Sequence, residues 1–288
     1  MGGCPAAPWI ESSNLDSGRR PDAVTEELFP IHRAMSVGAH PDDAEFGCAG
    51  TLAKLAEDGV EVTVVVCTAG NRGGEGDRTE EELARVRVEE QQAANHILGV
   101  KNYVNLGYDD GSLMPTLELR KDITRVIRKY RPNLVITSNP VRNFSSIGGN
   151  HPDHLATGEA TLAAIYPTAR NPMALPELLP EGLEKWVVDW VYITGQTLEK
   201  PNLYEDISRT IDKKANALLA HQSQLGDWVG KYARVSAKEA AERAAKAGVE
   251  GIEYAEEFLK LFTGEARAEG AAELVAAERR RARGELES

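Results

Sequence analysis

Two short segments of this sequence place histidine and aspartate at spacings that suit metal chemistry. They are Ala39-His40-Pro41-Asp42-Asp43 and His151-Pro152-Asp153-His154, and together they hold three of the six histidines. A hydrolytic zinc site needs three nitrogen or oxygen ligands and one position left for water. Zinc lowers the pKa of that water from about 15.7 toward about 7, and a carboxylate that is not a ligand can accept its proton. Together the two segments supply a complete hydrolytic set.

The local geometry of each segment favours this interpretation. His40 and Asp43 lie three residues apart in a turn, so both side chains can point inward from one loop. Pro152 suits the first position of a helix, which would put His151 and His154 one turn apart on the same side. Taken singly, each segment has an equally good structural explanation, a turn or a helix cap. Their occurrence as a pair is what favours a site.

The elements that must position these residues alternate along the chain. Hydrophobic periodicity and turn residues predict strands at 33–38, 61–68, 103–106, 134–137 and 186–194, and helices at 44–58, 79–98, 117–130, 154–165 and 204–221. A polar, glycine-rich loop occupies 70–77. Such alternation predicts an α/β fold, a doubly wound, mostly parallel, Rossmann-like sheet with helices on both faces. Both segments then fall at carboxyl ends of strands, where such sheets bind ligands.

Composition narrows the class of protein. The 288 residues carry a net charge of −12, which disfavours nucleic acid as a partner, and no apolar run approaches the roughly 20 residues of a membrane span. Three cysteines without a Cys-x-x-Cys pair predict neither disulfides nor thiolate metal binding. We expect a cytoplasmic protein with a flexible N-terminal arm at 1–30, a catalytic domain at 31–263 and a charged C-terminal tail at 264–288.

The two segments and their surroundings resemble the LmbE/PIG-L family of zinc-dependent de-N-acetylases. The family signature is AHPDD after the first strand and HPDH much later, and this chain has both. The blocks CTAGNRGGEG, ELARVRVEEQQAANHILGV, NLGYDDG and ALLAHQSQ follow in the family's order. The likeness runs from Met35 to Phe262, which leaves both ends outside it.

The resemblance implies that His40, Asp43 and His154 bind Zn²⁺ and that Asp42 is the general base. Iron or another divalent ion would also suit two imidazoles and a carboxylate. Some members of the family carry a tyrosine two residues before the second motif. Gly149 stands there in this chain, so any catalytic tyrosine would come from elsewhere.

Further roles are implied by the same resemblance. His151 would stabilise the oxyanion or protonate the leaving amine, and Asp153 would orient His151. Arg87 would contact the substrate, although a solvated helix face is the alternative for it. Asp110 would accept hydrogen bonds from sugar hydroxyls, and His221 would form a wall of the pocket or else cap its helix.

The resemblance therefore predicts a zinc-dependent hydrolase that removes an N-acetyl group from an amino-sugar-like small molecule or sugar conjugate, giving a free amine and acetate. It also implies a homo-oligomer, a trimer or a hexamer. Three alternatives stay open: a zinc hydrolase of another small amide or ester, a dinucleotide-binding protein, and a catalytically idle metal-binding protein. The dinucleotide alternative is weakened by two carboxylates where a pyrophosphate would bind, in Gly-Ala-His-Pro-Asp-Asp at 38–43.

Overall fold

A computed structural model describes most of the chain, namely residues 29–74, 76–144, 147, 150–195, 200–265 and 280. Most of the expected N-terminal arm and of the expected C-terminal tail lies outside the described residues, and so does Gly149. The boundaries expected at residues 30 and 264 stay predictions.

The described residues form one seven-stranded sheet in the order β3-β2-β1-β4-β5-β7-β6. Its strands are β1 (Arg33–Gly38), β2 (Glu61–Thr68), β3 (Asn102–Tyr108), β4 (Leu134–Ser138), β5 (Trp190–Thr194), β6 (Leu203–Asp206) and β7 (Ala255–Phe262). Neighbouring strands from β3 to β5 pair in parallel, whereas β7 is antiparallel to both β5 and β6. The predicted doubly wound, mostly parallel sheet is confirmed.

The order of the strands fixes where a ligand can bind. From β1 the chain continues outward to β2 and β3 on one side, and β4 and β5 extend the sheet on the other. The change of direction between β1 and β4 leaves a crevice beyond their carboxyl ends. Because Val37 pairs with Thr137, the segments that follow these two strands begin side by side. The two histidine-containing segments therefore meet at this crevice.

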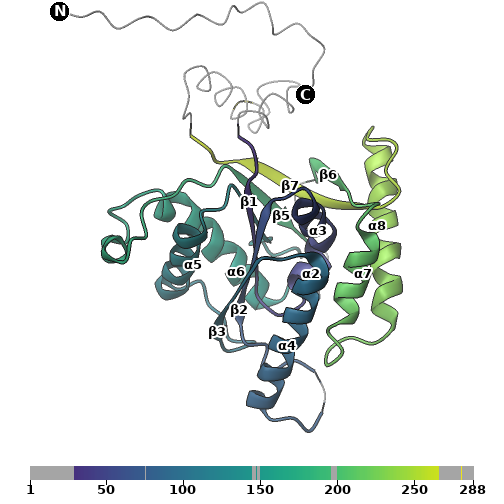
Figure 1. Cartoon of the computed structure of the whole chain (residues 1–288), viewed down its shortest axis with the longest axis horizontal. Coiled ribbons are helices and arrows are strands. Elements are labelled where there is room, and N and C mark those ends of the chain that lie inside the picture. Colours follow the sequence, from purple (N-terminus) through teal and green to yellow (C-terminus); the bar gives the residue numbers. More distant parts are fainter. Residues whose placement is uncertain are drawn as a thin grey trace, which may run out of the picture.

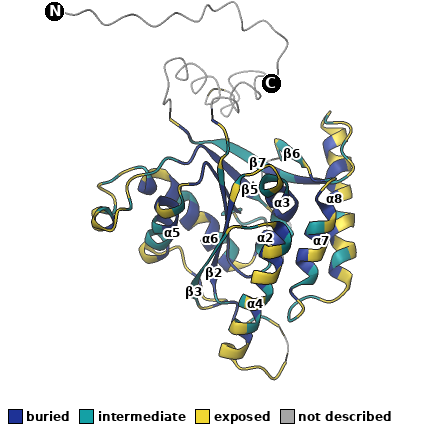
Figure 2. Ribbon diagram, viewed as in Figure 1, coloured by how far each residue is buried: buried dark blue, intermediate teal, exposed yellow. Residues whose placement is uncertain are grey.

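Helices cover both faces of the sheet (Figure 1). On one face α5 (Leu117–Tyr130) and α6 (Pro152–Ala163) bury residues such as Ile123 and Ile127 against β1, β2, β4 and β5. On the other face α2 (Asp43–Gly47) and α3 (Ala49–Glu57) pack on the sheet. Each buried isoleucine or leucine contributes about 1.5–3 kcal/mol. Figure 2 shows the buried sides of these helices turned toward the strands.

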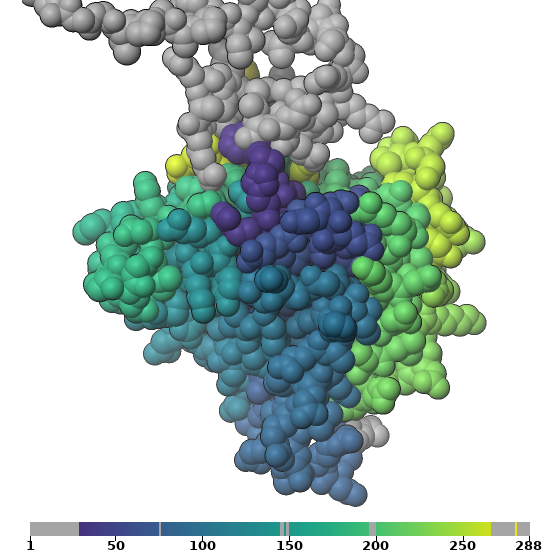
Figure 3. Space-filling model, viewed as in Figure 1, coloured from purple at the N-terminus to yellow at the C-terminus, as the bar shows by residue number. Residues whose placement is uncertain are grey.

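A second layer lies over α3. It consists of α4 (Glu80–Leu98) and α7 (Ile211–Leu219), which share a small alanine-rich cluster with α3. Figure 3 shows the blue residues of α4 beside the green residues that follow them far later in the sequence. The carboxylate of Glu90 on α4 accepts hydrogen bonds from the backbone and hydroxyl of Ser223, at 2.6 and 2.7 Å. These contacts bring residues 70–98 next to residues 211–225.

The helix predicted at 44–58 is two helices in the structure. The break falls at Cys48, and α3 begins again because a carboxylate from a distant strand caps it. The two oxygens of Glu256 on β7 accept the backbone N–H groups of Gly50 and Thr51 at 2.9 and 2.8 Å. The first amides of a helix lack partners within it, so this carboxylate stabilises the new start. No local signal could show that contact.

The C-terminal region differs most from the prediction. The helix expected at 204–221 begins only at Ile211, because residues 203–206 pair with β7 as β6. A long helix, α8 (Trp228–Lys246), and β7 itself were not predicted. After α6, residues Ala164–Ala169 form an irregular segment that is kinked at Tyr166, where φ is −137° and ψ is 124°, and Pro176–Glu181 form a 3₁₀ helix. Within the described residues, no helix has both the length and the apolar character needed to cross a bilayer.

Gly158 provides a test of how α6 is seated on the sheet. A Cβ at this position would lie 2.3 Å from the Ser138 carbonyl oxygen at the end of β4. We therefore expect Gly158→Ala to lower the free energy of unfolding by about 1–3 kcal/mol, since the helix must move off the strand. Glu159→Ala, at the adjacent exposed position, is the control. Equal denaturation midpoints for the two variants would contradict this close packing.

Candidate metal centre and active site

The three predicted metal ligands converge at the crevice between β1 and β4. The Nδ1 atom of His40 lies 3.2 Å from Nε2 of His154, and that Nε2 lies 3.0 Å from Oδ1 of Asp43. The Nδ1 of His40 is 3.9 Å from Oδ2 of Asp43. One ligand atom from each residue lies within 4.8 Å of the others, although 114 positions separate the two histidines. Such proximity is what a shared cation requires.

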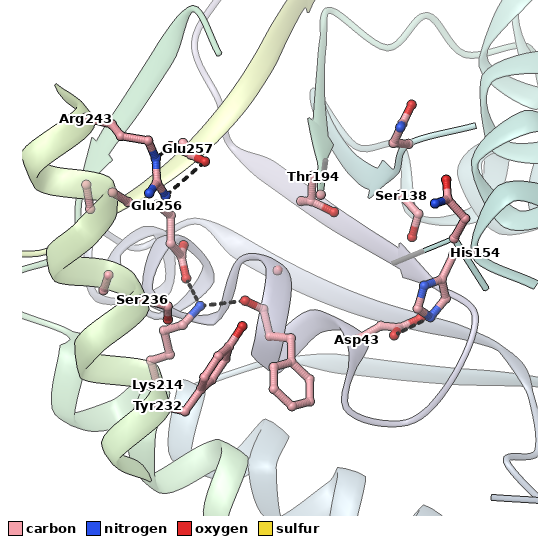
Figure 4. Close-up of a pocket in the computed structure, with 18 of the residues that line it drawn as sticks. Asp43, Ser138, His154, Thr194, Lys214, Tyr232, Ser236, Arg243, Glu256 and Glu257 are labelled. Atoms are coloured by element: carbon pink, nitrogen blue, oxygen red, sulfur yellow. Dashed lines mark hydrogen bonds and ion pairs between the residues drawn. The ribbon is translucent and has the colours of Figure 1, made fainter. Parts of the chain in front are cut away.

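Backbone groups set the orientation of these side chains. The Oδ2 atom of Asp43 accepts the N–H groups of Ala39 and His40, at 2.7 and 3.0 Å, and so turns back over the loop after β1. His151 is the N-cap of α6, and its Nδ1 accepts the N–H of Asp153. Pro152 occupies the first turn as predicted. The start of α6 thereby presents His154 toward Asp43, as Figure 4 shows.

The far side of the His40 ring faces two further carboxylates. Its Nε2 lies 3.0 Å from Oδ1 of Asp110 and 3.3 Å from Oδ2 of Asp153. Burial alone would lower the pKa of His40, but the hydrogen bond to Asp110 and the charges of Asp43, Asp110 and Asp153 raise it to about 9. The surroundings therefore favour positive charge at this position, as a cation-binding site does.

These residues fit a divalent cation. A histidine that binds a metal through one ring nitrogen usually donates the other N–H to a carboxylate, and His40 has Asp110 and Asp153 placed for that bond. A second cluster of His40, Asp110 and His151 also brings ligand atoms together. Arg87 lies 3.7 Å from Asp110, and its charge disfavours a cation there. The first cluster is the better metal site.

Asp42 is held beside the cluster of His40, Asp43 and His154 in an unusual backbone conformation. Its φ is 105°, in the left-handed region that side chains other than glycine rarely adopt. The side-chain oxygen Oε1 of Gln91 accepts the Asp42 N–H at 3.1 Å and stabilises this turn. The Asp42 side chain makes no capping hydrogen bond to α2 in the described structure, so capping does not explain its presence.

The two adjacent aspartates differ in their electrostatics. Burial and the charge of Asp43 raise the pKa of Asp42, while Arg87 and His221 oppose the rise. Burial would also raise the pKa of Asp43, but the charge and hydrogen bond of His154, together with His40, lower it. The lowered pKa keeps Asp43 ionised, as a metal ligand must be. Asp42, whose pKa is raised, is the more readily protonated of the two.

Arg87 lies inside the protein, so the alternative of a solvated helix face is wrong. Its side chain is only 4% exposed. The guanidinium donates to the carbonyl oxygens of Pro41 at 2.6 Å and Gly70 at 3.2 Å, and to Oδ2 of Asp42 at 3.3 Å. A Cβ on Gly70 or Gly73 would lie only 2.8 or 2.6 Å from Nη1 of the guanidinium, which explains why glycines line this loop. Arg87 thus joins α4 to both loops of the site.

The other predicted residues lie at different depths. His151 is exposed, and its ring centroid is 4.7 Å from that of His40. Asp153 is fully buried, and its oxygens accept the N–H groups of Gly111 and Leu113. The imidazole that the Asp153 carboxylate contacts is that of His40. The sequence had instead predicted that Asp153 would orient His151. Whether Asp153 also orients His151 during the reaction stays a prediction.

His221 lies behind the site instead of in its wall. It is wholly buried, and its Nε2 is 3.4 Å from Oε2 of Glu45. Burial opposes protonation, but the nearby carboxylate of Glu45, with the charges of Asp42 and Glu90, raises the pKa of His221. Glu45 and Gln91 were missed by sequence analysis. Gln91 lies four residues after Arg87 on α4, on the same helix face, and this spacing was the signal available for it.

A cleft of about 370 Å³ opens beside the candidate metal centre (Figure 4). Asp43 and His154 stand at one end, and the far wall is formed by α8 and the start of β7. Ser138 and Thr194, at the ends of β4 and β5, line its floor. The volume falls within the range of about 300–1,000 Å³ that is usual for small-molecule sites.

Comparison with known proteins places this geometry in a family. Residues 35–165 match the family described as PIG-L, GlcNAc-PI de-N-acetylase. A diacetylchitobiose deacetylase of Thermococcus kodakarensis is 32% identical over 206 residues, which cover 70% of this chain and 73% of that protein. The chain belongs to the PIG-L family.

Other members of the PIG-L family support the same placement. A mycothiol S-conjugate amidase of Streptomyces coelicolor is 29% identical over 71% of this chain and 86% of its own length. The solved structure of N,N'-diacetylchitobiose deacetylase from Pyrococcus horikoshii superposes with a TM-score of 0.72 at 27% identity, covering 86% of this chain and 95% of that one. The PIG-L match contains both histidine segments and ends before α8.

Asp110 tests whether the carboxylates behind His40 support a bound metal. We expect Asp110→Asn to weaken zinc affinity about 10- to 100-fold, because the His40 ring loses a charged hydrogen-bond acceptor. Asp109→Asn is the matched control, since the adjacent Asp109 side chain is 60% exposed and pairs with Arg72. Competitive titration against a zinc-binding dye measures both. An unchanged affinity in Asp110→Asn would rule out this supporting role.

Proposed function

We propose that this protein is a zinc-dependent hydrolase that removes the N-acetyl group from an amino-sugar-like substrate, releasing a free amine and acetate. The observation that carries the proposal is the convergence of His40, Asp43 and His154, with the spare carboxylate of Asp42 beside them. Membership of the PIG-L family and the deacetylases among its relatives support the reaction and the substrate class.

Amide hydrolysis needs an activated water, a stabilised oxyanion and a proton for the departing nitrogen. A zinc ion held by His40, Asp43 and His154 would polarise the amide carbonyl and acidify water. Asp42 accepts the proton of the attacking water. Arg87 and Gln91 keep that carboxylate and its strained backbone in place through the contacts described above.

His151 supplies a hydrogen-bond donor at the open side of the site. Its Nδ1 accepts a backbone N–H, so the neutral ring carries its proton on Nε2. From the mouth of the site this Nε2–H donates a hydrogen bond to the oxyanion. Asp42, protonated by the attacking water, gives that proton to the nitrogen as the C–N bond breaks. The products are a free amine and acetic acid, which ionises to acetate.

A second function within the same chemistry is hydrolysis of another small amide. The similarity to a mycothiol S-conjugate amidase favours this alternative, because that relative is named for a different amide. Dinucleotide binding is disfavoured, since Asp42 and Asp43 occupy the turn where a pyrophosphate would need backbone N–H groups.

The proposed function is tested by metal analysis and by release of primary amine. We expect purified protein to contain about one zinc per chain and to deacetylate N-acetylated amino sugars in preference to N-acyl amino acids. Dialysis against a chelator should abolish amine release, and added zinc should restore it. Iron and cobalt in place of zinc test which ion supports turnover. Activity that survives complete metal removal would overturn the proposal.

Substitutions at the two adjacent aspartates separate catalysis from metal binding. We expect Asp42→Asn to retain zinc and to lose about 10²- to 10⁴-fold in kcat, because the amide cannot accept a proton. Asp43→Ala should instead lose the metal, because one of three ligands is removed. Zinc content and kcat are measured on the same preparations. Full activity in Asp42→Asn would show that another group is the base.

A further inference from the structure

The peptide group between Pro41 and Asp42 is held at both ends by side chains of α4. Its carbonyl oxygen accepts a hydrogen bond of 2.6 Å from Nη2 of Arg87, and its N–H donates to Oε1 of Gln91 at 3.1 Å. This peptide sets the φ angle of Asp42, which is 105°. Turning the peptide over would bring φ to about −75°, which most residues adopt, but would break both hydrogen bonds. The two contacts therefore maintain the strained conformation of Asp42.

The side-chain amide of Gln91 can make its contact in only one of two orientations. Its oxygen must face the Asp42 N–H, because the amide nitrogen cannot accept a hydrogen bond. The nitrogen Nε2 then donates to Oε1 of Glu45 at 2.8 Å and to Oδ1 of Asn95 at 3.2 Å. A reversed amide would set two donors against each other at Asp42 and two acceptors against each other at Glu45. The surroundings of Gln91 therefore select the orientation that holds Asp42.

Of the two acceptors that Gln91 meets, Glu45 is the one that decides this orientation. The Nδ2 atom of Asn95 has no hydrogen-bond partner among the described residues, so the Asn95 amide could turn and offer a donor instead. A carboxylate has only acceptors, so Glu45 always requires the donor end of Gln91. Both Glu45 and Gln91 are wholly buried, and bulk water therefore offers neither of them another partner.

The buried charge of Glu45 is compensated by His221. The Nε2 atom of His221 lies 3.4 Å from Oε2 of Glu45, the oxygen that accepts no hydrogen bond from the described residues. The ring is wholly buried just after the end of α7, where the backbone N–H of His221 donates to the carbonyl oxygen of Leu218. A buried carboxylate is costly without an opposite charge, and an imidazolium at this position supplies one. The mechanism proposed above gives neither residue a role.

We propose that Glu45 and His221 form a buried positioning pair, which fixes the amide of Gln91 in the orientation that holds Asp42 in place for catalysis. The inference rests on the proposed function, in which Asp42 is the base. Neither residue touches the substrate: Glu45 acts through Gln91, and His221 acts through Glu45.

Exchanging the donor and the acceptor between positions 45 and 91 tests this pair. Gln91→Glu sets a second carboxylate against Glu45 and should lower kcat on N-acetylglucosamine about 10- to 100-fold, with KM and zinc content unchanged. Glu45→Gln leaves the amide of Gln91 free to reverse and should lower kcat about 3- to 10-fold. The double variant Glu45→Gln/Gln91→Glu should recover kcat to within about threefold of the unaltered protein, because the new amide donates to the new carboxylate.

Further variants control for charge and test His221. Gln92→Glu adds the same charge at the adjacent, exposed position of α4 and should leave kcat unchanged. His221→Leu should lower kcat about 3- to 10-fold, and His221→Gln, which keeps a donor for Glu45, should lose less. A double variant no faster than Gln91→Glu would overturn the proposal, and an unchanged kcat in His221→Leu would overturn the part assigned to His221. If Gln91→Glu does not fold, Gln91→Met replaces it and should show a similar loss.

Crystal structures of the same variants measure the position of Asp42 without turnover. We expect a positive φ at Asp42 in the unaltered protein and in the double variant, and a negative φ in Gln91→Glu or Gln91→Met. A positive φ in that single variant would overturn the positioning role, whatever its kcat. If φ follows the expected pattern but the unaltered protein releases no amine from N-acetylated sugars, only the proposed function fails.

Discussion

Like charges crowded at the carboxyl ends of β1 and β4 are the constraint on which this structure depends. Four carboxylates gather here with little access to water: those of Asp43, Asp110 and Asp153 lie around the His40 ring, and that of Asp42 pairs with Arg87. Buried carboxylates repel one another and are stable only when hydrogen bonds and opposite charges satisfy them. Here backbone N–H groups, imidazoles and one buried arginine do so, and a divalent cation would complete the balance.

The same constraint explains why distant elements are tied to the site. Arg87 reaches from α4 to the loop after β1 and to the glycine-rich loop, so that its charge offsets Asp42 and Asp110. Gln91, one turn later, holds the Asp42 backbone in a strained conformation and in turn donates to Glu45. The strain is local, and the surrounding helices supply the contacts that maintain it. The position of the Asp42 carboxylate therefore depends on the packing of α4.

The C-terminal elements shape the access to this centre. α8 and β7 lie beyond the PIG-L match, yet Glu256 of β7 caps α3 and pairs with Lys214 of α7, so β7 is anchored to a helix inside the match. The far wall of the cleft therefore comes from a different part of the chain than His40, Asp43 and His154.

The sequence by itself determined the alternation of strands and helices and the sheet type, and it pointed to the three residues that converge at the candidate metal centre, because hydrophobic periodicity and the two histidine segments are local signals. What only the tertiary structure decided depends on contacts between distant residues: the break before α3, the strand β6 where a helix was expected, and the burial of Arg87 and His221. Neither a capping carboxylate on β7 nor the pairing of β6 with β7 can be recognised from the residues close in sequence to the element that it affects. The sequence therefore sufficed to predict the order of strands and helices up to α6, but it did not predict the shape of the cleft.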